Sequence, residues 1–286
     1  MLCNDGPYDN WQGEYAALLA ATGGPEIIGI VVNASAAWPD LESNVDGWRR
    51  LVAAARDSGL ETLPDPISSA GQPLVRPADE VAESTQPNRS QGAEFIVDAS
   101  RGSDPRRPLV VVTGGRLTDV ADAYLIDSTL PERVVIVASL GALEAGGAKM
   151  GRPNGEMDPW ADAIVVEKFR YVQVSAYYDQ LSDVPAERVT ELPDNAFGAW
   201  IAAKRSTIFG LPEGADQVAI AALGMTEFVR DVQRVSRSSN EPLSLEEGPA
   251  LEPAPSGSAW LVTASNGAAA TARFWELLSD PATYDR

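Results

Sequence analysis

Residues 109–138 read LVVVTGGRLTDVADAYLIDSTLPERVVIVA, and this stretch decides the fold class. It opens with the apolar run 109–112 and closes with a second run, 134–138; both are rich in β-branched residues, as buried parallel strands are. Between them, residues 118–126 carry a helical pattern. A strand, a helix and a second strand in this order form the unit from which a parallel sheet with helices on its faces is built.

The same alternation extends in both directions along the chain. Further helices are predicted at 15–19, 45–58, 93–100, 159–166, 196–205 and 216–229, with a last one ending at Leu278, and further strands at 27–32, 172–175 and 260–263. Stretches 63–91, 141–155 and 241–258 are rich in Pro, Gly or polar residues and are predicted as loops. We therefore expect an α/β fold, with a mostly parallel central sheet flanked by helices, as one domain over residues 1–286.

The composition excludes several classes of function. Forty-one acidic residues against 22 basic ones give a net charge of −19, which repels phosphate polyanions, so we expect no nucleic-acid partner. Solubility is the plainer explanation of this charge. No apolar run approaches the roughly 18 residues that a membrane helix needs, so no membrane partner is expected. The sequence shows no charged-then-apolar leader, so we expect a cytoplasmic protein, with export after removal of a leader as the alternative.

The absence of histidine limits the chemistry of any site. It excludes Ser-His-Asp and Cys-His mechanisms as well as histidine metal ligands. Cys3 is the only cysteine, which excludes an internal disulfide and a cysteine zinc cluster. Acid–base chemistry must use Asp, Glu, Lys, Tyr or water, and a bound metal would be a hard cation held by oxygens, either calcium or magnesium.

Polar residues that directly follow apolar runs are the candidates for a site, because ligands bind beyond the carboxyl ends of parallel strands. Four segments qualify: 4–10 (NDGPYDN), 113–119 (TGGRLTD), 154–161 (NGEMDPWA) and 214–216 (GAD). In the first, a Gly-Pro turn can bring Asp5, Asp9 and Asn10 together. Close carboxylates repel unless a cation or a proton lies between them, so a metal site is one interpretation. A turn in which Asp and Asn bond to their own backbone is the other.

The remaining segments each have a plain structural explanation. Thr118 or Asp119 can cap the helix that follows the double glycine, and Asp158 before a proline is typical of a helix start. Asp216 can likewise be a simple cap. The functional alternatives are a main-chain carbonyl that the 113–119 loop offers to a cation, and an exposed Asn154 amide that holds a polar ligand.

Taken together, the order and spacing of these segments resemble the inosine-uridine-preferring nucleoside hydrolase family. The family's opening D-x-D-P-G-x-D-D is similar to residues 5–10, its G-P-L-T-N to 115–119, its E-F-N and D-P-E-A-A to 152–154 and 158–162, and its late H-D to 215–216. The likeness runs from the first residues to at least Leu223.

The resemblance implies the family's α/β fold and hydrolysis of an N-glycosidic bond between ribose and a base. It implies that Asp5 is both a calcium ligand and the general base. The other implied calcium ligands are Asp9, Asn10, the main-chain oxygen of Thr118, and Asp216. The implied substrate-binding residues at the sugar are Asn33 and Asn154, which would hold ribose hydroxyls, and Arg152. The aromatic side chains of Trp160, Tyr8 and Trp11 could stack on the leaving base. Ordinary packing is the alternative for these three aromatic residues.

Several positions depart from the family pattern. Asn10 stands where a second Asp is expected, which removes a negative charge from the cation site and should weaken binding. Arg152 takes the place of a ribose-binding Glu, and Ala215 that of a histidine associated with protonation of the leaving group. Cys3 and Asn4 replace the usual Asp-Thr. These changes predict a substrate unlike inosine or uridine.

We therefore hypothesise a divergent calcium-dependent hydrolase that acts on a ribosyl or related glycosidic bond of a small nucleoside or glycoside, with Ca²⁺ as cofactor. The resemblance also implies a homo-oligomer. The alternative is a non-catalytic protein that binds a sugar-like or nucleoside-like ligand, since Arg152 could hold an anionic group. A purely structural interaction protein is the third alternative, and it predicts neither ligand nor cation.

Overall fold

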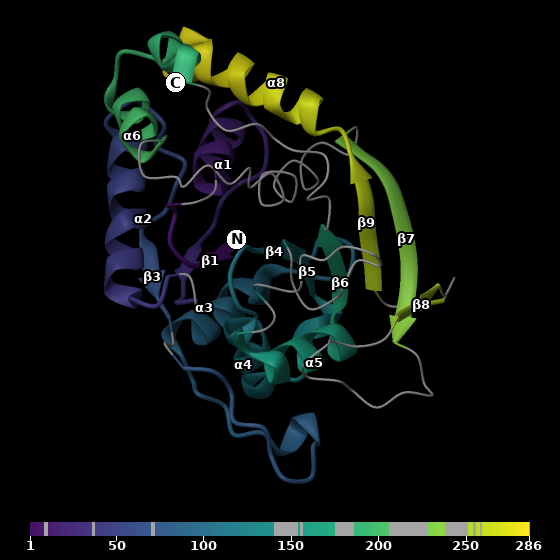
Figure 1. The fold of residues 1–286 in the computed structure, drawn as a ribbon. Coiled ribbons are helices and arrows are strands. Elements are labelled where there is room, and N and C mark those ends of the chain that lie inside the picture. The colour runs from purple at the N-terminus through teal and green to yellow at the C-terminus, as the bar shows by residue number, and fades with distance from the viewer. Residues whose placement is uncertain are drawn as a thin grey trace.

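One mixed sheet organises the part of the chain that the computed structural model describes: residues 1–8, 11–35, 38–69, 72–139, 154, 157–174, 186–205, 228–237, 251–253, 256–257 and 259–285. Within these residues the sheet has nine strands in the order β3-β2-β1-β4-β5-β6-β9-β7-β8. Figure 1 shows helices on both of its faces.

The strands are β1 (Leu2–Asn4), β2 (Ile30–Val32), β3 (Pro66–Ser68), β4 (Leu109–Thr113), β5 (Val134–Ser139), β6 (Arg170–Val174), β7 (Val229–Arg237), β8 (Leu251–Pro253) and β9 (Ala259–Ser265). In the sheet order, every neighbouring pair in the series β3-β2-β1-β4-β5-β6-β9 is parallel. Strand β7 pairs antiparallel with both β9 and β8. Parallel strands bring their carboxyl ends to one side of the sheet, which we call the carboxyl edge. The residues after β1, β2, β4 and β5 therefore lie along the same edge.

The helices are α1 (Gln12–Ala21), α2 (Leu41–Arg56), α3 (Gln91–Ala99), α4 (Thr118–Ile126), α5 (Pro159–Lys168), α6 (Ala196–Arg205) and α8 (Gly267–Ser279). Helices α1, α2, α6 and α8 share one buried apolar cluster, and α3, α4 and α5 share another. The strands contribute to both clusters because successive side chains point to opposite faces: Val137 of β5 joins the first and Ile136 the second. In Figure 1 the two helix groups lie on opposite sides of the strands.

Helix starts follow the expected capping chemistry, with one correction. Asp158 caps α5 by accepting a hydrogen bond from the main-chain N–H of Ala161 at 3.1 Å, which confirms that prediction. The predicted capping of α4 by Thr118 or Asp119 is wrong. Leu117 occupies the N-cap position and makes no side-chain cap, whereas Thr118 and Asp119 lie in the first turn and their side chains bond to other elements.

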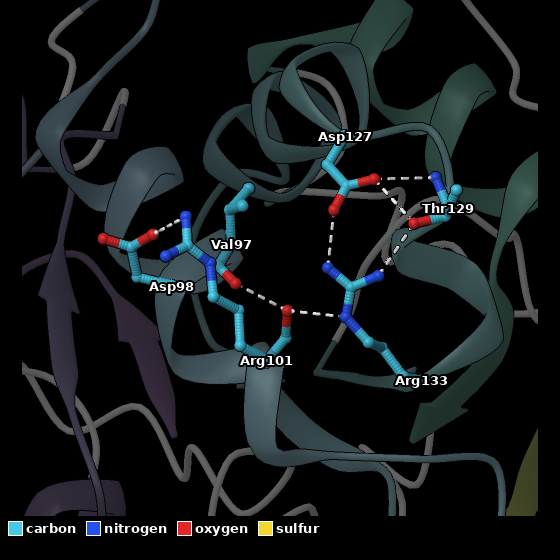
Figure 2. Close-up of polar contacts among 7 residues, drawn as sticks. Val97, Asp98, Arg101, Asp127, Thr129 and Arg133 are labelled. Atoms are coloured by element: carbon cyan, nitrogen blue, oxygen red, sulfur yellow. Dashed lines mark hydrogen bonds and ion pairs between the residues drawn. The ribbon is translucent and has the colours of Figure 1, made fainter.

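At the opposite edge of the sheet, Arg133 joins three elements (Figure 2). Its guanidinium donates to Asp127 at 2.6 Å, to Thr129 at 2.9 Å and to the hydroxyl of Ser100 at 3.0 Å. Ser100 in turn donates to the main-chain oxygen of Val97 at 2.7 Å. The ends of α3 and α4 are thereby tied to the start of β5.

Most of the predicted elements are present. Helices α4 and α6 have the predicted bounds, and the strands expected at 109–112, 134–138, 172–175 and 260–263 are found with ends shifted by one or two residues. Helix α2 begins four residues earlier than predicted because Asp40 caps it, its carboxylate accepting from the N–H of Ser43.

The predictions are wrong at strands β3, β8 and β7. The stretch 63–91 was predicted as loop but contains β3, and 241–258 contains β8. Val229, expected at the end of a helix, begins β7. The rest of the helix predicted at 216–229, and the 141–155 loop apart from Asn154, lie outside the described residues. None of the helices in the described ranges combines the length and apolar character that a bilayer crossing requires.

Candidate functional site

The carboxyl edge gathers polar side chains that are withdrawn from solvent. Asp5 follows β1 and is 5% exposed, and Asn33 follows β2 and is fully buried. Thr113 and Ser139, the last residues of β4 and β5, are also buried. Asn33 Oδ1, Thr113 Oγ1 and Ser139 Oγ have no hydrogen-bond partner among the described residues. Buried oxygens are rarely left unbonded, so these atoms indicate a place that a ligand or water completes.

The main chain of Asp5 is held from both sides. The side-chain oxygen of Asn4 accepts the N–H of Asp5 at 2.9 Å, and the amide of Asn4 donates to Gln12 of α1. Trp48 of α2 donates its indole N–H to the carbonyl oxygen of Asp5 at 2.7 Å. Two helices therefore fix the backbone from which the Asp5 carboxylate projects.

Two glycines allow the loop after β4 to pass close to this backbone. A Cβ atom on Gly115 would lie 2.5 Å from Asn33 Oδ1 and 3.0 Å from the main-chain nitrogen of Asp5. A Cβ atom on Gly114 would lie 2.7 Å from the side-chain oxygen of Asn4. Because neither position has room for a Cβ atom, both residues 114 and 115 must be glycine. Gly115 borders the main chain of Asp5 and the side chain of Asn33.

The orientation of the Asn33 amide is defined by its surroundings. Its Nδ2 donates to the main-chain oxygen of Arg116 at 3.2 Å and to Asp119 Oδ2 at 3.5 Å, and lies 3.7 Å from the sulfur of Cys3. The oxygen is thereby turned toward Gly115. Because an amide oxygen only accepts hydrogen bonds, Asn33 presents an acceptor at the carboxyl edge.

Asp119 is a second buried carboxyl group beneath this amide. Its Oδ1 accepts from the hydroxyls of Ser69, after β3, and of Ser90, the N-cap of α3, the latter at 2.9 Å. Burial raises the pKa of Asp119, and the hydrogen bonds from Ser69, Ser90 and Asn33 act in the opposite direction. The sequence suggested only a helix-capping role for Asp119. Its place directly after a strand and a double glycine was the available signal for a role at the site.

Arg116 places a cation among these carboxyl groups. The residue is 5% exposed. Burial lowers the pKa of Arg116, and attraction to Asp119, Asp158 and Asp5 counteracts this. Nothing in the sequence had indicated a role for Arg116 within the 113–119 loop. The structure thus adds a positive charge within electrostatic range of Asp5.

Thr118, a predicted source of a calcium ligand, uses its hydroxyl elsewhere. Thr118 Oγ1 donates to Asp158 Oδ2 at 2.7 Å, and Asp158 Oδ2 also accepts the main-chain N–H of Leu74 at 2.9 Å. Burial raises the pKa of Asp158, and these hydrogen bonds oppose the rise. The side chain of Thr118 therefore ties α4 to α5, and the predicted role of its main-chain oxygen stays a prediction.

Two predicted substrate-binding residues, Asn154 and Trp160, make side-chain contacts within the protein. Asn154 donates its side-chain amide to the main-chain oxygen of Ser139 at 2.8 Å, at the end of β5. The indole N–H of Trp160 donates to Thr85 at 2.9 Å, and the guanidinium of Arg76 lies 5.4 Å from the ring centre. Trp160 thus packs between α5 and the segment before α3, and its stacking role stays a prediction.

The predicted residues Asp9, Asn10, Arg152 and Asp216 lie outside the described residues. Among the residues that are described, no group of three or more acidic or cysteine side chains could hold a metal ion. The donors that are described at the carboxyl edge, the Asp5 carboxylate and the unbonded Asn33 oxygen, are hard oxygen atoms of the kind that calcium prefers. These oxygen donors are of the type that a hard cation takes, and the described residues alone do not form a complete metal site.

Solved structures of nucleoside hydrolases share this fold over nearly their whole length. An inosine-guanosine nucleoside hydrolase has 18% sequence identity and a TM-score of 0.61, with 99% of this chain and 98% of that chain covered. A purine-preferring ribonucleoside hydrolase from Gardnerella vaginalis has 15% identity and a TM-score of 0.62, with 99% of each chain covered. An inosine-uridine preferring nucleoside hydrolase from Bacillus anthracis has 13% identity and a TM-score of 0.59, over 99% and 98%.

These similarities confirm the predicted fold class, a mostly parallel α/β sheet of the nucleoside hydrolase type. The resemblance noted in the sequence is thereby confirmed at the level of the fold. No family model matches the sequence, and no curated protein sequence matches it.

Proposed function

We propose that this chain hydrolyses the N-glycosidic bond of a nucleoside or a related ribosyl compound, with Asp5 as the general base. One observation carries the proposal: in the fold of the nucleoside hydrolases, Asp5 is a buried acidic residue directly after strand β1, and its main-chain nitrogen borders Gly115, as does the acceptor oxygen of Asn33. A general base must lie within reach of the proton it removes, next to a group that holds the substrate.

The proposed cofactor is Ca²⁺, held by Asp5, Asp9, Asn10, Asp216 and the main-chain oxygen of Thr118. Calcium in such a site orients a water molecule and lowers its pKa. The amide at Asn10 gives the site one negative charge fewer than a second aspartate would, so we expect weaker binding than in a site with that aspartate.

The chain's own groups supply the remaining steps of the proposed reaction. The carboxylate of Asp5 accepts a proton from the attacking water. The Asn33 oxygen accepts a hydrogen bond from a sugar hydroxyl, and Asn154 holds a second hydroxyl. Positive charge develops on the sugar as the bond to the base breaks, and the carboxylates at this edge stabilise that charge. Because the sequence has no histidine, the leaving base takes its proton from another residue or from water.

The test is turnover of a panel of nucleosides by the parent chain and by Asp5→Asn. We expect the rate to fall by about 10²- to 10⁴-fold in the variant, as for loss of a general base, with the melting temperature unchanged. Asp98→Asn, in an exposed ion pair of α3, is the control and should retain the parent rate. Parent-like turnover by Asp5→Asn removes Asp5 from the base role.

Calorimetric titration of calcium into metal-stripped protein tests the cofactor separately. We expect saturable one-to-one binding that is lost in Asp9→Ala. Absence of binding at millimolar calcium in the parent chain contradicts the calcium assignment.

Arg116 favours a second candidate, a non-catalytic protein that binds an anionic sugar or nucleoside. Its buried guanidinium lies within electrostatic range of Asp5 and could neutralise that carboxylate or hold an anion. Tight binding of a phosphorylated or carboxylated sugar without turnover, lost in Arg116→Ala, would support this function. Turnover of an uncharged nucleoside by Arg116→Ala at the parent rate would contradict it.

A further inference from the structure

We propose that Asp119 is a positioning residue that fixes the amide of Asn33, so that Asn33 offers only its oxygen to a ligand. The nature of the ligand rests on the proposed function, whereas the positioning itself rests on contacts within the protein. Asp119 is fully buried in the first turn of α4 and acts through Asn33.

An asparagine amide can present either of its two ends to a ligand, since its oxygen accepts and its nitrogen donates. The nitrogen of Asn33 faces two groups that accept, the main-chain oxygen of Arg116 at 3.2 Å and Asp119 Oδ2 at 3.5 Å. Reversal of the amide would place an oxygen against both acceptors and lose both hydrogen bonds. The buried Oδ1 therefore stays on the side of Gly115, where it has no partner among the described residues.

Asp119 is itself held from two further elements. Ser69 and Ser90 both donate to Oδ1 of Asp119, which leaves Oδ2 for Asn33. The thiol of Cys3 lies next to the other oxygen, with its sulfur 4.0 Å from Oδ2 of Asp119. The carboxyl group of Asp119 is therefore surrounded by donors from β1 and from residues adjacent to β2, β3 and α3.

This arrangement selects the ligand by its chemistry. An acceptor oxygen that cannot reverse takes a hydroxyl or amine donor and disfavours a carboxylate or phosphate oxygen at the same place. In the proposed reaction, the matching group is a sugar hydroxyl. Asp119 thus contributes to specificity at a distance, through the orientation of Asn33.

Hydrogen exchange of the Asn33 side-chain amide tests the positioning without any ligand. The two amide protons are observed by NMR on the ¹⁵N-labelled full chain and assigned by their loss in Asn33→Ala. We expect their exchange to accelerate at least tenfold in Asp119→Ala. The matched control is Asp122→Ala, a buried carboxyl group in the same helix that accepts from the main chains of Arg89 and Ser90, and it should stay within twofold of the parent.

Exchange at the parent rate in Asp119→Ala overturns the proposal, as does equal acceleration by both variants. If Asp119→Ala does not fold, Asp119→Asn replaces it. The neutral amide is a weaker acceptor than a carboxylate, so we expect several-fold faster exchange, and parent-like exchange overturns the proposal.

Where the parent chain shows turnover, a double-mutant cycle gives a second readout. Asp119→Ala should raise KM about tenfold in the parent background and leave KM unchanged in an Asn33→Ala background, because coupled residues are not additive. Equal increases in both backgrounds show that Asp119 acts independently of Asn33 and overturn the proposal. A parent chain without turnover contradicts the proposed function, and the exchange comparison then still decides the positioning.

Discussion

The ammonium of Lys204 lies 2.7 Å from Glu14 Oε1, and neither side chain is more than 1% exposed. This ion pair joins α6 to α1, and Trp200 donates its indole N–H to the same carboxylate oxygen at 2.7 Å. The ammonium also lies 4.5 Å from the ring centre of Trp11. Both charges are removed from water. The ion pair therefore affects the free energy of unfolding chiefly when one partner is lost and the other charge stays buried alone.

Substitution Lys204→Met should lower the free energy of unfolding by about 3–5 kcal/mol, since the Glu14 carboxylate would stay buried without its counter-charge. Urea denaturation measures the loss. The double variant Glu14→Gln/Lys204→Met removes the isolated charge and keeps an acceptor for Trp200, so it should recover most of the stability. A double variant no more stable than the single one contradicts this account.

Arg133 and Arg101, both shown in Figure 2, form a matched pair of arginines that differ in burial. Arg133 makes three side-chain hydrogen bonds and is largely buried, so Arg133→Ala should cost about 1.5–3 kcal/mol of unfolding free energy. The side chain of Arg101 is 73% exposed and pairs with an exposed Asp98, so Arg101→Ala should cost about 0–1 kcal/mol. Equal losses in urea denaturation would show that the links from Arg133 to α3 and α4 add no stability.

Glu83 should contribute to stability in a pH-dependent way. Hydrogen bonds from Lys168 and then from Tyr124 lower the pKa of Glu83 to about 2. An unfolded glutamate has a pKa of about 4.3, so the contribution of Glu83 is complete above that pH and is lost as the pH falls toward 2.

The substitution Glu83→Gln should therefore make the loss of stability between these two pH values shallower. Thermal melts across this range, with the exposed Glu132→Gln as control, measure the slope. A slope that changes equally in the two variants would mean that the contacts of Glu83 do not cause it.

Gly115 should tolerate no side chain. In Gly115→Ala the new Cβ would meet Asn33 Oδ1 and the backbone of Asp5, so we expect a loss of about 1–3 kcal/mol from overpacking, together with lower turnover of any nucleoside substrate. Gly102 has no atom within 4 Å of its Cβ position, so Gly102→Ala should stay within about 0.5 kcal/mol of the parent. Equal stability and turnover in the two variants would show that the space beside Gly115 can adjust.

The contrast between α4 and β7 explains which elements could be predicted. Helix α4 has the predicted bounds because its hydrogen bonds form within the segment and its signals are local. Strand β7 has the sequence VRDVQRVSR, whose valines recur every third residue as on a helix. Its hydrogen bonds come from β9 and β8, which follow it in the chain, so its own pattern could not reveal it. The three-residue strands β1, β3 and β8 are too short to show a period.

The features of the candidate site likewise separate into those that local sequence predicts and those that tertiary contacts create. The sequence alone determined that Asn33 follows a strand, that histidine chemistry is excluded, and that any metal would be held by oxygen. Those conclusions depend on residue types and on local order. Only the tertiary structure decided that Asn33 and Asp119, 86 residues apart, share a hydrogen bond and that Arg116 is within electrostatic range of Asp5. Parallel pairing of strands distant in the chain creates these contacts, and no periodicity within a single segment encodes them.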